Sequence, residues 1–136
     1  MAYELREHTA DVAVEARGDT VGAVFASVAD GMAAAMCESV PESGDRFEVE
    51  VVAEGLEAAL FDYLDELIYE RDVRGVLPVE HRATVERRGD EWLVRGSARG
   101  VPLLSVDARE VKAVTYSEMV LEERDGGWYA YVVLDV

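Results

Sequence analysis

Residues 21–37, VGAVFASVADGMAAAMC, decide the fold class of this 136-residue chain. Their larger apolar side chains recur every three or four residues, which predicts a helix with one wide buried face. The positions on this face are Val21, Val24, Phe25, Val28, Met32, Ala35 and Met36. Thr20 or Asp19 has the right chemistry to cap the start of the helix. Residues 41–44, Pro-Glu-Ser-Gly, end it.

A second helix and several strands surround this first helix. The second helix follows Gly55 and carries an apolar stripe from Leu56 to Ile68. Alternating apolar residues predict strands at 3–5, 12–16, 47–53, 76–88, 92–99, 119–124 and 128–135. Gly89-Asp90 and Asp125-Gly126-Gly127 are typical hairpin turns. We therefore predict one α+β domain over residues 1–136, with a mostly antiparallel sheet of about seven strands covered on one side by two amphipathic helices.

The charge of the chain is strongly acidic. Twenty-nine acidic residues against 13 basic ones give a formal net charge of −16. The acids are spread over every segment, and Lys112 is the only lysine among the basic residues. Such a surface is typical of a protein that works in molar salt, where screening within about 3 Å removes the self-repulsion. We interpret the charge as a halophilic adaptation.

Membrane and redox signals are weak in this sequence. No apolar run approaches the roughly 20 residues that a membrane helix needs, and the chain begins with strand-like sequence rather than a leader. Cys37 is the only cysteine, so no intramolecular disulfide can form, and its place on an apolar helix favours an inert thiol. We expect a cytoplasmic protein that does not bind membranes.

Three segments place polar residues inside apolar, β-type runs. They are His8-Thr9-Ala10-Asp11, Val111-Lys112-Ala113-Val114-Thr115-Tyr116 and Leu134-Asp135-Val136. Packing alone would favour apolar residues at these polar positions, so each segment is a candidate for chemistry.

The residues alone leave several roles open. Asp11 and Asp135 could bind a cation through hard oxygen ligands, or Asp11 could cap a turn and Asp135 could be solvated. His8 could bind a metal, shuttle a proton or hydrogen-bond the backbone. Lys112 could pair with an acid or a phosphate, or extend into solvent. A structural role is favoured for His81, which lies in a predicted strand.

Other functional classes lack their motifs. No Gly-rich phosphate loop occurs, so we expect no nucleotide site in the chain itself. Ser27 and Ser105 lack a positioned histidine, which leaves a nucleophilic triad unsupported. The basic residues are dispersed without an aromatic platform, which argues against direct sequence-specific RNA binding.

Four blocks, in this order, resemble the archease family. They are residues 8–12 followed by Gly18-Asp19-Thr20 and the helix that contains Phe25, residues 60–69, residues 111–116 and residues 134–136. Archeases are small accessory proteins of the tRNA-splicing RNA ligase, which joins RNA ends bearing a 2′,3′-cyclic phosphate or a 3′-phosphate. The resemblance implies an activator of that ligase that promotes its guanylylation and multiple turnover in tRNA splicing and RNA repair.

The resemblance also implies specific site residues and partners. A divalent cation, calcium first with magnesium or manganese as alternatives, would be bound by Asp11, Asp135 and the main-chain carbonyl of Val136. His8 and Lys112 become candidates for contact with the ligase, and RNA would be reached only through the ligase. The protein would not itself be an enzyme. Two other functions remain open: a stand-alone metal-dependent phosphoester hydrolase, with His8 as base, and a generic chaperone or scaffold.

The cation-site hypothesis makes a geometric prediction. The first β segment and the last strand must lie side by side, although they come from opposite ends of the chain. Lys112 should lie at the same end of the molecule.

Overall fold

The structure is a computed structural model that describes residues 3–8 and 11–136, with backbone alone at residues 6–8. Its elements, in chain order, are β1 (Tyr3–His8), β2 (Asp11–Gly18), α1 (Val21–Met36), β3 (Arg46–Ala53), α2 (Leu56–Arg74), β4 (Val76–Arg88), β5 (Glu91–Pro102), a 3₁₀ turn (Leu103–Ser105), β6 (Ala113–Val114), β7 (Val120–Arg124) and β8 (Gly127–Asp135). The predicted α+β class is confirmed.

The described strands form two antiparallel sheets rather than the single sheet that we expected. The first sheet has the order β1-β2-β8-β6, with β7 also paired to β8, and the second has the order β3-β5-β4. The described residues form eight strands, against about seven predicted. The additional strand is β6, which has only two residues and therefore carries no alternation that a sequence pattern could detect.

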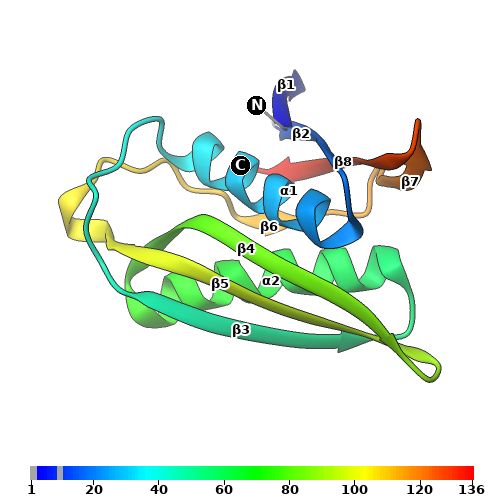
Figure 1. Ribbon diagram of the computed structural model, residues 1–136. Coiled ribbons are helices and arrows are strands. Elements are labelled where there is room, and N and C mark those ends of the chain that lie inside the picture. Colours follow the sequence, from blue (N-terminus) through cyan, green and yellow to red (C-terminus); the bar gives the residue numbers. More distant parts are fainter. Residues whose placement is uncertain (1–2, 9–10) are drawn as a thin grey trace.

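Helix α1 lies between the first sheet and β4, and α2 lies behind the second sheet in the view of Figure 1. Helix α1 contacts β1, β2 and β8 of the first sheet and β4 of the second, while α2 contacts β3, β4 and β5 and reaches β6 and β7. The rings of Phe25 on α1 and Tyr63 on α2 meet at 6.0 Å between centroids. Both helices and both sheets therefore share one apolar core.

The helix ends follow the expected local chemistry. The Thr20 side chain accepts a hydrogen bond from the Ala23 N–H at 3.0 Å, so Thr20 rather than Asp19 caps α1. Helix α2 ends at Gly75, whose φ of 66° is left-handed and whose N–H donates to the Arg71 carbonyl. Neither described helix is long and apolar enough to cross a lipid bilayer.

Candidate functional site

The candidate site lies at the end of β8, where three segments meet. Strands β2 and β8 pair antiparallel along their full length, and Asp11 is directly opposite Asp135. Residues directly opposite each other in an antiparallel pair have side chains on the same face, with Cβ atoms about 4.5 to 5.5 Å apart. The predicted adjacency of the first β segment and the last strand is therefore found, and it brings the two candidate carboxylates together.

The segment that contains Lys112 reaches the same end of β8 from the side opposite β2. The Lys112 N–H donates to the Asp135 carbonyl at 2.8 Å, and Ala113 pairs with Asp135 in the short strand β6. Two residues further, Thr115 donates to the Val133 carbonyl through its N–H and its hydroxyl, at 3.1 and 3.0 Å. Lys112 is exposed and Asp135 is half-buried, so the ammonium group can extend from this end of β8 into solvent.

The donor set at this end of β8 suits a hard cation, although it is incomplete. Asp11 and Asp135 are both half-buried, and within the described residues neither makes a side-chain hydrogen bond or ion pair. Carboxylate and carbonyl oxygens are the ligands that Ca²⁺ and Mg²⁺ prefer. Across the described side chains, however, no group of three or more His, Cys, Asp or Glu gathers around one point. Two carboxylates alone leave most coordination positions to other ligands.

Val136 and His8 are the other two predicted residues near this site. Val136 is half-buried and packs against the core, which leaves its proposed role as a carbonyl ligand a prediction. The backbone of His8 lies opposite Asp11 in the pairing of β1 with β2. The side chain of His8 lies outside the described residues, so its role also stays a prediction.

A buried arginine that our sequence analysis missed holds the Lys112 segment in place. Arg71 on α2 is 8% exposed, and its Nη1 donates to the Val111 carbonyl at 2.8 Å. The Nε of Arg71 donates to Asp72 at 2.9 Å. In the loop before Val111, the Arg109 N–H donates to the Met36 carbonyl at the end of α1. The sequence signal was available, because Arg71 continues the buried stripe of α2 four residues after Leu67. Through its Nη1 hydrogen bond, Arg71 connects Val111, the residue before Lys112, directly to α2.

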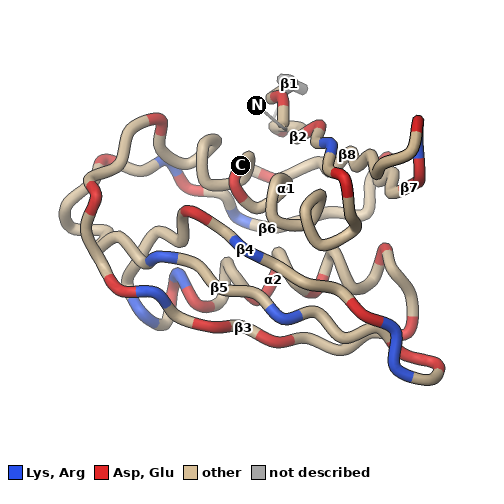
Figure 2. The backbone as a smooth tube through the Cα atoms, in the orientation of Figure 1, with Lys and Arg blue, Asp and Glu red and all other residues tan. Residues whose placement is uncertain are grey.

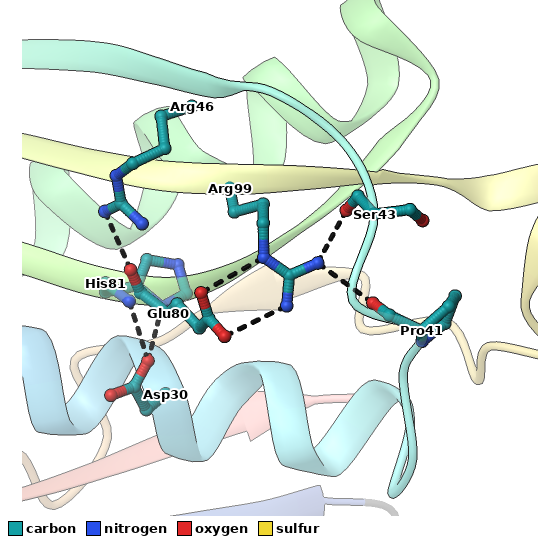
Figure 3. Close-up of polar contacts among 7 residues, drawn as sticks. All are labelled: Asp30, Pro41, Ser43, Arg46, Glu80, His81 and Arg99. Carbon is teal, nitrogen blue, oxygen red and sulfur yellow. Dashed lines mark hydrogen bonds and ion pairs between the residues drawn. The ribbon is translucent and has the colours of Figure 1, made fainter.

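A second polar cluster joins α1 to the β4 edge of the second sheet (Figure 3). One carboxylate oxygen of Asp30 accepts from the His81 N–H at 3.0 Å and lies 2.8 Å from His81 Nδ1. The pairing of β4 with β5 shifts register between Val79 and Arg82, and Glu80 in this bulge has a φ of 51°. The bulge turns both donors of His81 toward α1. His81 thus takes part in a structural contact, as the sequence analysis favoured.

The bulge also anchors the connection between α1 and β3. Glu80 forms a bidentate ion pair with Arg99, whose remaining nitrogen donates to the carbonyls of Pro41 and Ser43 (Figure 3). Arg46 donates to the Glu80 carbonyl at 2.8 Å. These contacts satisfy the arginines within the fold, so the cluster is best understood as a structural clamp.

Two polar atoms near Asp30 are buried without a described partner. They are the Tyr63 hydroxyl and His81 Nε2. Burial, and to a lesser extent the charge of Asp30, raises the pKa of Tyr63 well above its usual value. The Tyr63 hydroxyl therefore stays protonated over the whole working range of pH.

Substitutions in this cluster should have unequal effects on stability. Tyr63→Phe is expected to change the free energy of unfolding by less than about 1 kcal/mol, because the hydroxyl it removes has no described partner. Asp30→Ala should cost about 1 to 3 kcal/mol, because it leaves two buried donors of His81 unpaired. Denaturant titration in molar salt measures both. A larger loss for Tyr63→Phe than for Asp30→Ala would contradict these roles.

Comparison with known proteins identifies the family. The family model of the archease protein family matches residues 3–136. "Protein archease" of Pyrococcus furiosus is 32% identical over 139 aligned residues, which cover 98% of each chain. The chain belongs to the archease family. "Protein archease" of Methanosarcina mazei is 35% identical and covers 98% of this chain and 95% of that protein.

Solved structures agree with the archease assignment. The solution structure of protein 1598 of Methanobacterium thermoautotrophicum has a TM-score of 0.87 at 29% identity and covers 99% of both chains. An archease of Thermotoga maritima, described as a possible chaperone, has a TM-score of 0.64 at 24% identity and covers 98% of this chain and 96% of its own. The second likeness concerns the fold alone. The archease resemblance inferred from the four sequence blocks is therefore confirmed.

Proposed function

We propose that this archease activates the tRNA-splicing RNA ligase that joins 2′,3′-cyclic-phosphate or 3′-phosphate ends. It would act in the cytoplasm, promote guanylylation and multiple turnover of the ligase, and meet RNA only through that enzyme. The observation that carries this proposal is the meeting of Asp11, Asp135 and the Lys112 main chain at the C-terminal end of β8. Two acidic residues and the main chain of one lysine, from three distant segments, meet there.

A divalent cation would be bound at this end of β8. The carboxylates of Asp11 and Asp135 and the main-chain carbonyl of Val136 would be its ligands, with calcium favoured over magnesium or manganese. Such a cation would supply positive charge that a phosphate of the ligase complex could approach. The chain's own residues orient the site: the strand pair holds the carboxylates on one face, and Arg71 and Thr115 position the segment that carries Lys112.

An accessory role and a stand-alone hydrolase place different demands on this site, and the side chain of His8, the base of the hydrolase alternative, lies outside the described residues. A stand-alone metallohydrolase needs its own metal ligands and a positioned base. The described side chains supply two carboxylates at this end of β8 and no third acid, histidine or cysteine gathered with them. An accessory protein can leave the remaining coordination positions to its partner. In the proposed accessory role, the ligase fills those positions when it binds.

A guanylylation assay tests the proposal. The matching ligase, GTP and wild-type or variant archease are combined in molar KCl, and the ligase–GMP adduct and the number of ligations per ligase are measured. Asp11→Asn, Asp135→Asn and Lys112→Met should each lower the stimulation at least about tenfold, equivalent to about 1.4 kcal/mol. Asp90→Asn, in the exposed turn between β4 and β5, is the matched control and should stimulate like the wild type.

The other two functions predict different outcomes. Phosphoester hydrolysis by the purified archease alone, abolished by Asp11→Asn, would favour the hydrolase. Full stimulation by both Asp11→Asn and Asp135→Asn would favour the generic chaperone or scaffold. Calorimetric titration with CaCl₂ tests the cation separately, and we expect wild-type binding to be lost in Asp11→Asn and retained in Asp90→Asn.

A further inference from the structure

Exposed apolar side chains gather on the outer side of α2. Within the described side chains, six large apolar or aromatic ones are exposed: Leu5, Val52, Tyr69, Val73, Leu104 and Tyr116. Tyr69 and Val73 are 58% and 63% exposed on α2, and Tyr116 is 55% exposed. The Tyr116 ring stacks on Phe61 of α2, with centroids 4.2 Å apart and planes 8° from parallel. We call Phe61, Tyr69, Val73 and Tyr116 the α2 ridge.

The helical residues of the α2 ridge follow one row of α2, in which Asp65 lies between Phe61 and Tyr69. Positions 61, 65, 69 and 73 are four residues apart, which places them along one ridge of a helix. The fully exposed Leu104 lies near its end, because the Leu103 N–H donates to the carbonyl of Gly75, which caps α2. Single exposed apolar residues need no explanation, but a contiguous group of them indicates an interaction surface.

Folding alone does not account for the α2 ridge. The opposite side of α2 already fills the core through Leu60, Tyr63, Leu64 and Leu67, which are at most 1% exposed. Within the ridge, Phe61 packs against the core, whereas Tyr69, Val73 and Tyr116 are each more than half exposed. The surface of this chain is strongly acidic. The exposed aromatic and aliphatic residues of the ridge therefore contrast with the acidic residues on the same face of α2.

Acidic side chains border the α2 ridge. Asp65 lies within the row, Asp62 and Glu66 flank it, and Asp72 lies beside Val73. Burial raises the pKa of the Tyr116 phenol, and the charge of Asp62 raises it further. The Asp62 carboxylate therefore lies near the Tyr116 ring. The surface therefore combines apolar side chains with acidic ones, of which Asp65 lies within the row and the others at its rim.

The α2 ridge is continuous with the candidate site. The segment 111–116 carries Lys112 beside Asp135 at one end and Tyr116 on Phe61 at the other. Between them, Thr115 is fixed to Val133. A macromolecule that reached Lys112 would therefore extend naturally over Tyr116 and along α2.

We propose that the α2 ridge docks into an apolar groove with a basic rim on the ligase, and so supplies much of the affinity between the two proteins. This inference rests on the proposed function. A second copy of the chain is a poorer occupant, because a symmetric contact would bury Asp62, Asp65 and Asp72 against the same acids. RNA is a poorer occupant as well, since the acidic rim faces its phosphates with like charge.

The test separates binding from stimulation. Affinity for the immobilised ligase and stimulation of guanylylation are measured in molar KCl for the wild type, Tyr69→Ala/Val73→Ala and Tyr116→Ala. We expect the double variant to raise both the Kd and the half-maximal concentration at least about tenfold, with maximal stimulation at saturation unchanged. Val52→Ala is the matched control, because Val52 is 50% exposed on β3, outside the α2 ridge. This variant should behave like the wild type.

Four other outcomes would overturn the docking surface, its occupant or the proposed function. If Tyr69→Ala/Val73→Ala binds the ligase as tightly as the wild type, the docking surface is wrong while the proposed function stands. If the wild type binds through the ridge and does not stimulate guanylylation, the proposed function is wrong while the docking surface stands. Absence of wild-type binding overturns the docking proposal. A wild-type dimer that the double variant converts to a monomer in sedimentation would replace the ligase by a second copy as occupant.

Discussion

Lowering the KCl concentration from about 1 M to about 0.01 M is expected to unfold this domain, because the Debye length grows from about 3 Å to about 30 Å. Twenty-nine acids then repel one another against only 13 bases. Figure 2 shows the acids distributed over helices, strands and loops, so no single pairing can relieve the repulsion. Many of the bases already form local pairs, such as Arg95 with Glu50 and Arg124 with Glu122.

Circular dichroism and thermal melting across a KCl series measure this effect. We expect loss of helical signal, or a fall of tens of degrees in Tm, at the low end of the series. Sucrose at low salt is the control, because it favours compact states without screening charge. A spectrum and Tm that stay constant from molar to millimolar KCl would contradict the halophilic interpretation, and full rescue by sucrose would argue against charge repulsion as the cause.

Gly44→Ala is expected to lower the free energy of unfolding by about 3 kcal/mol or more. Gly44 has a φ of 97°, a conformation that strains any L side chain. A Cβ added there would also overlap the carbonyl oxygen of Gly100. The surrounding loop cannot easily move away, because Arg99 binds the Pro41 and Ser43 carbonyls and the Gly100 N–H donates to the Asp45 carbonyl at 2.9 Å.

Gly126→Ala separates backbone strain from the clash. Gly126 has a φ of 80°, and no atom lies within 4 Å of an added Cβ, so only strain of about 1 to 3 kcal/mol is expected. Denaturant titrations of both variants in molar KCl measure the difference. Equal losses would show that the contact with Gly100 relaxes without cost, and would contradict the tight packing of this connection.

Local patterns in the sequence were sufficient for both helices and for seven of the eight described strands. The three- and four-residue spacing predicted residues 21–37 as a helix, and α1 spans Val21–Met36. The Asp125-Gly126 turn predicted the last hairpin, and both residues have the positive φ that such a turn needs, 51° and 80°. These features depend on neighbours within a few residues, so the sequence alone determines them.

Contacts between distant segments were decided only by the tertiary structure. Polar residues in apolar runs marked Asp11 and Asp135 as candidates, but their register depends on the pairing of β2 with β8, two strands that most of the chain separates. The division into two sheets, the two-residue strand β6 and the burial of Arg71 against Val111 depend likewise on long-range pairing. Helix α2 carries apolar residues both on the α2 ridge and on its core-facing side, and the residue types alone do not separate the two groups. Only packing of the opposite side of α2 decides which apolar residues remain exposed, because burial is a property of the whole assembly of elements.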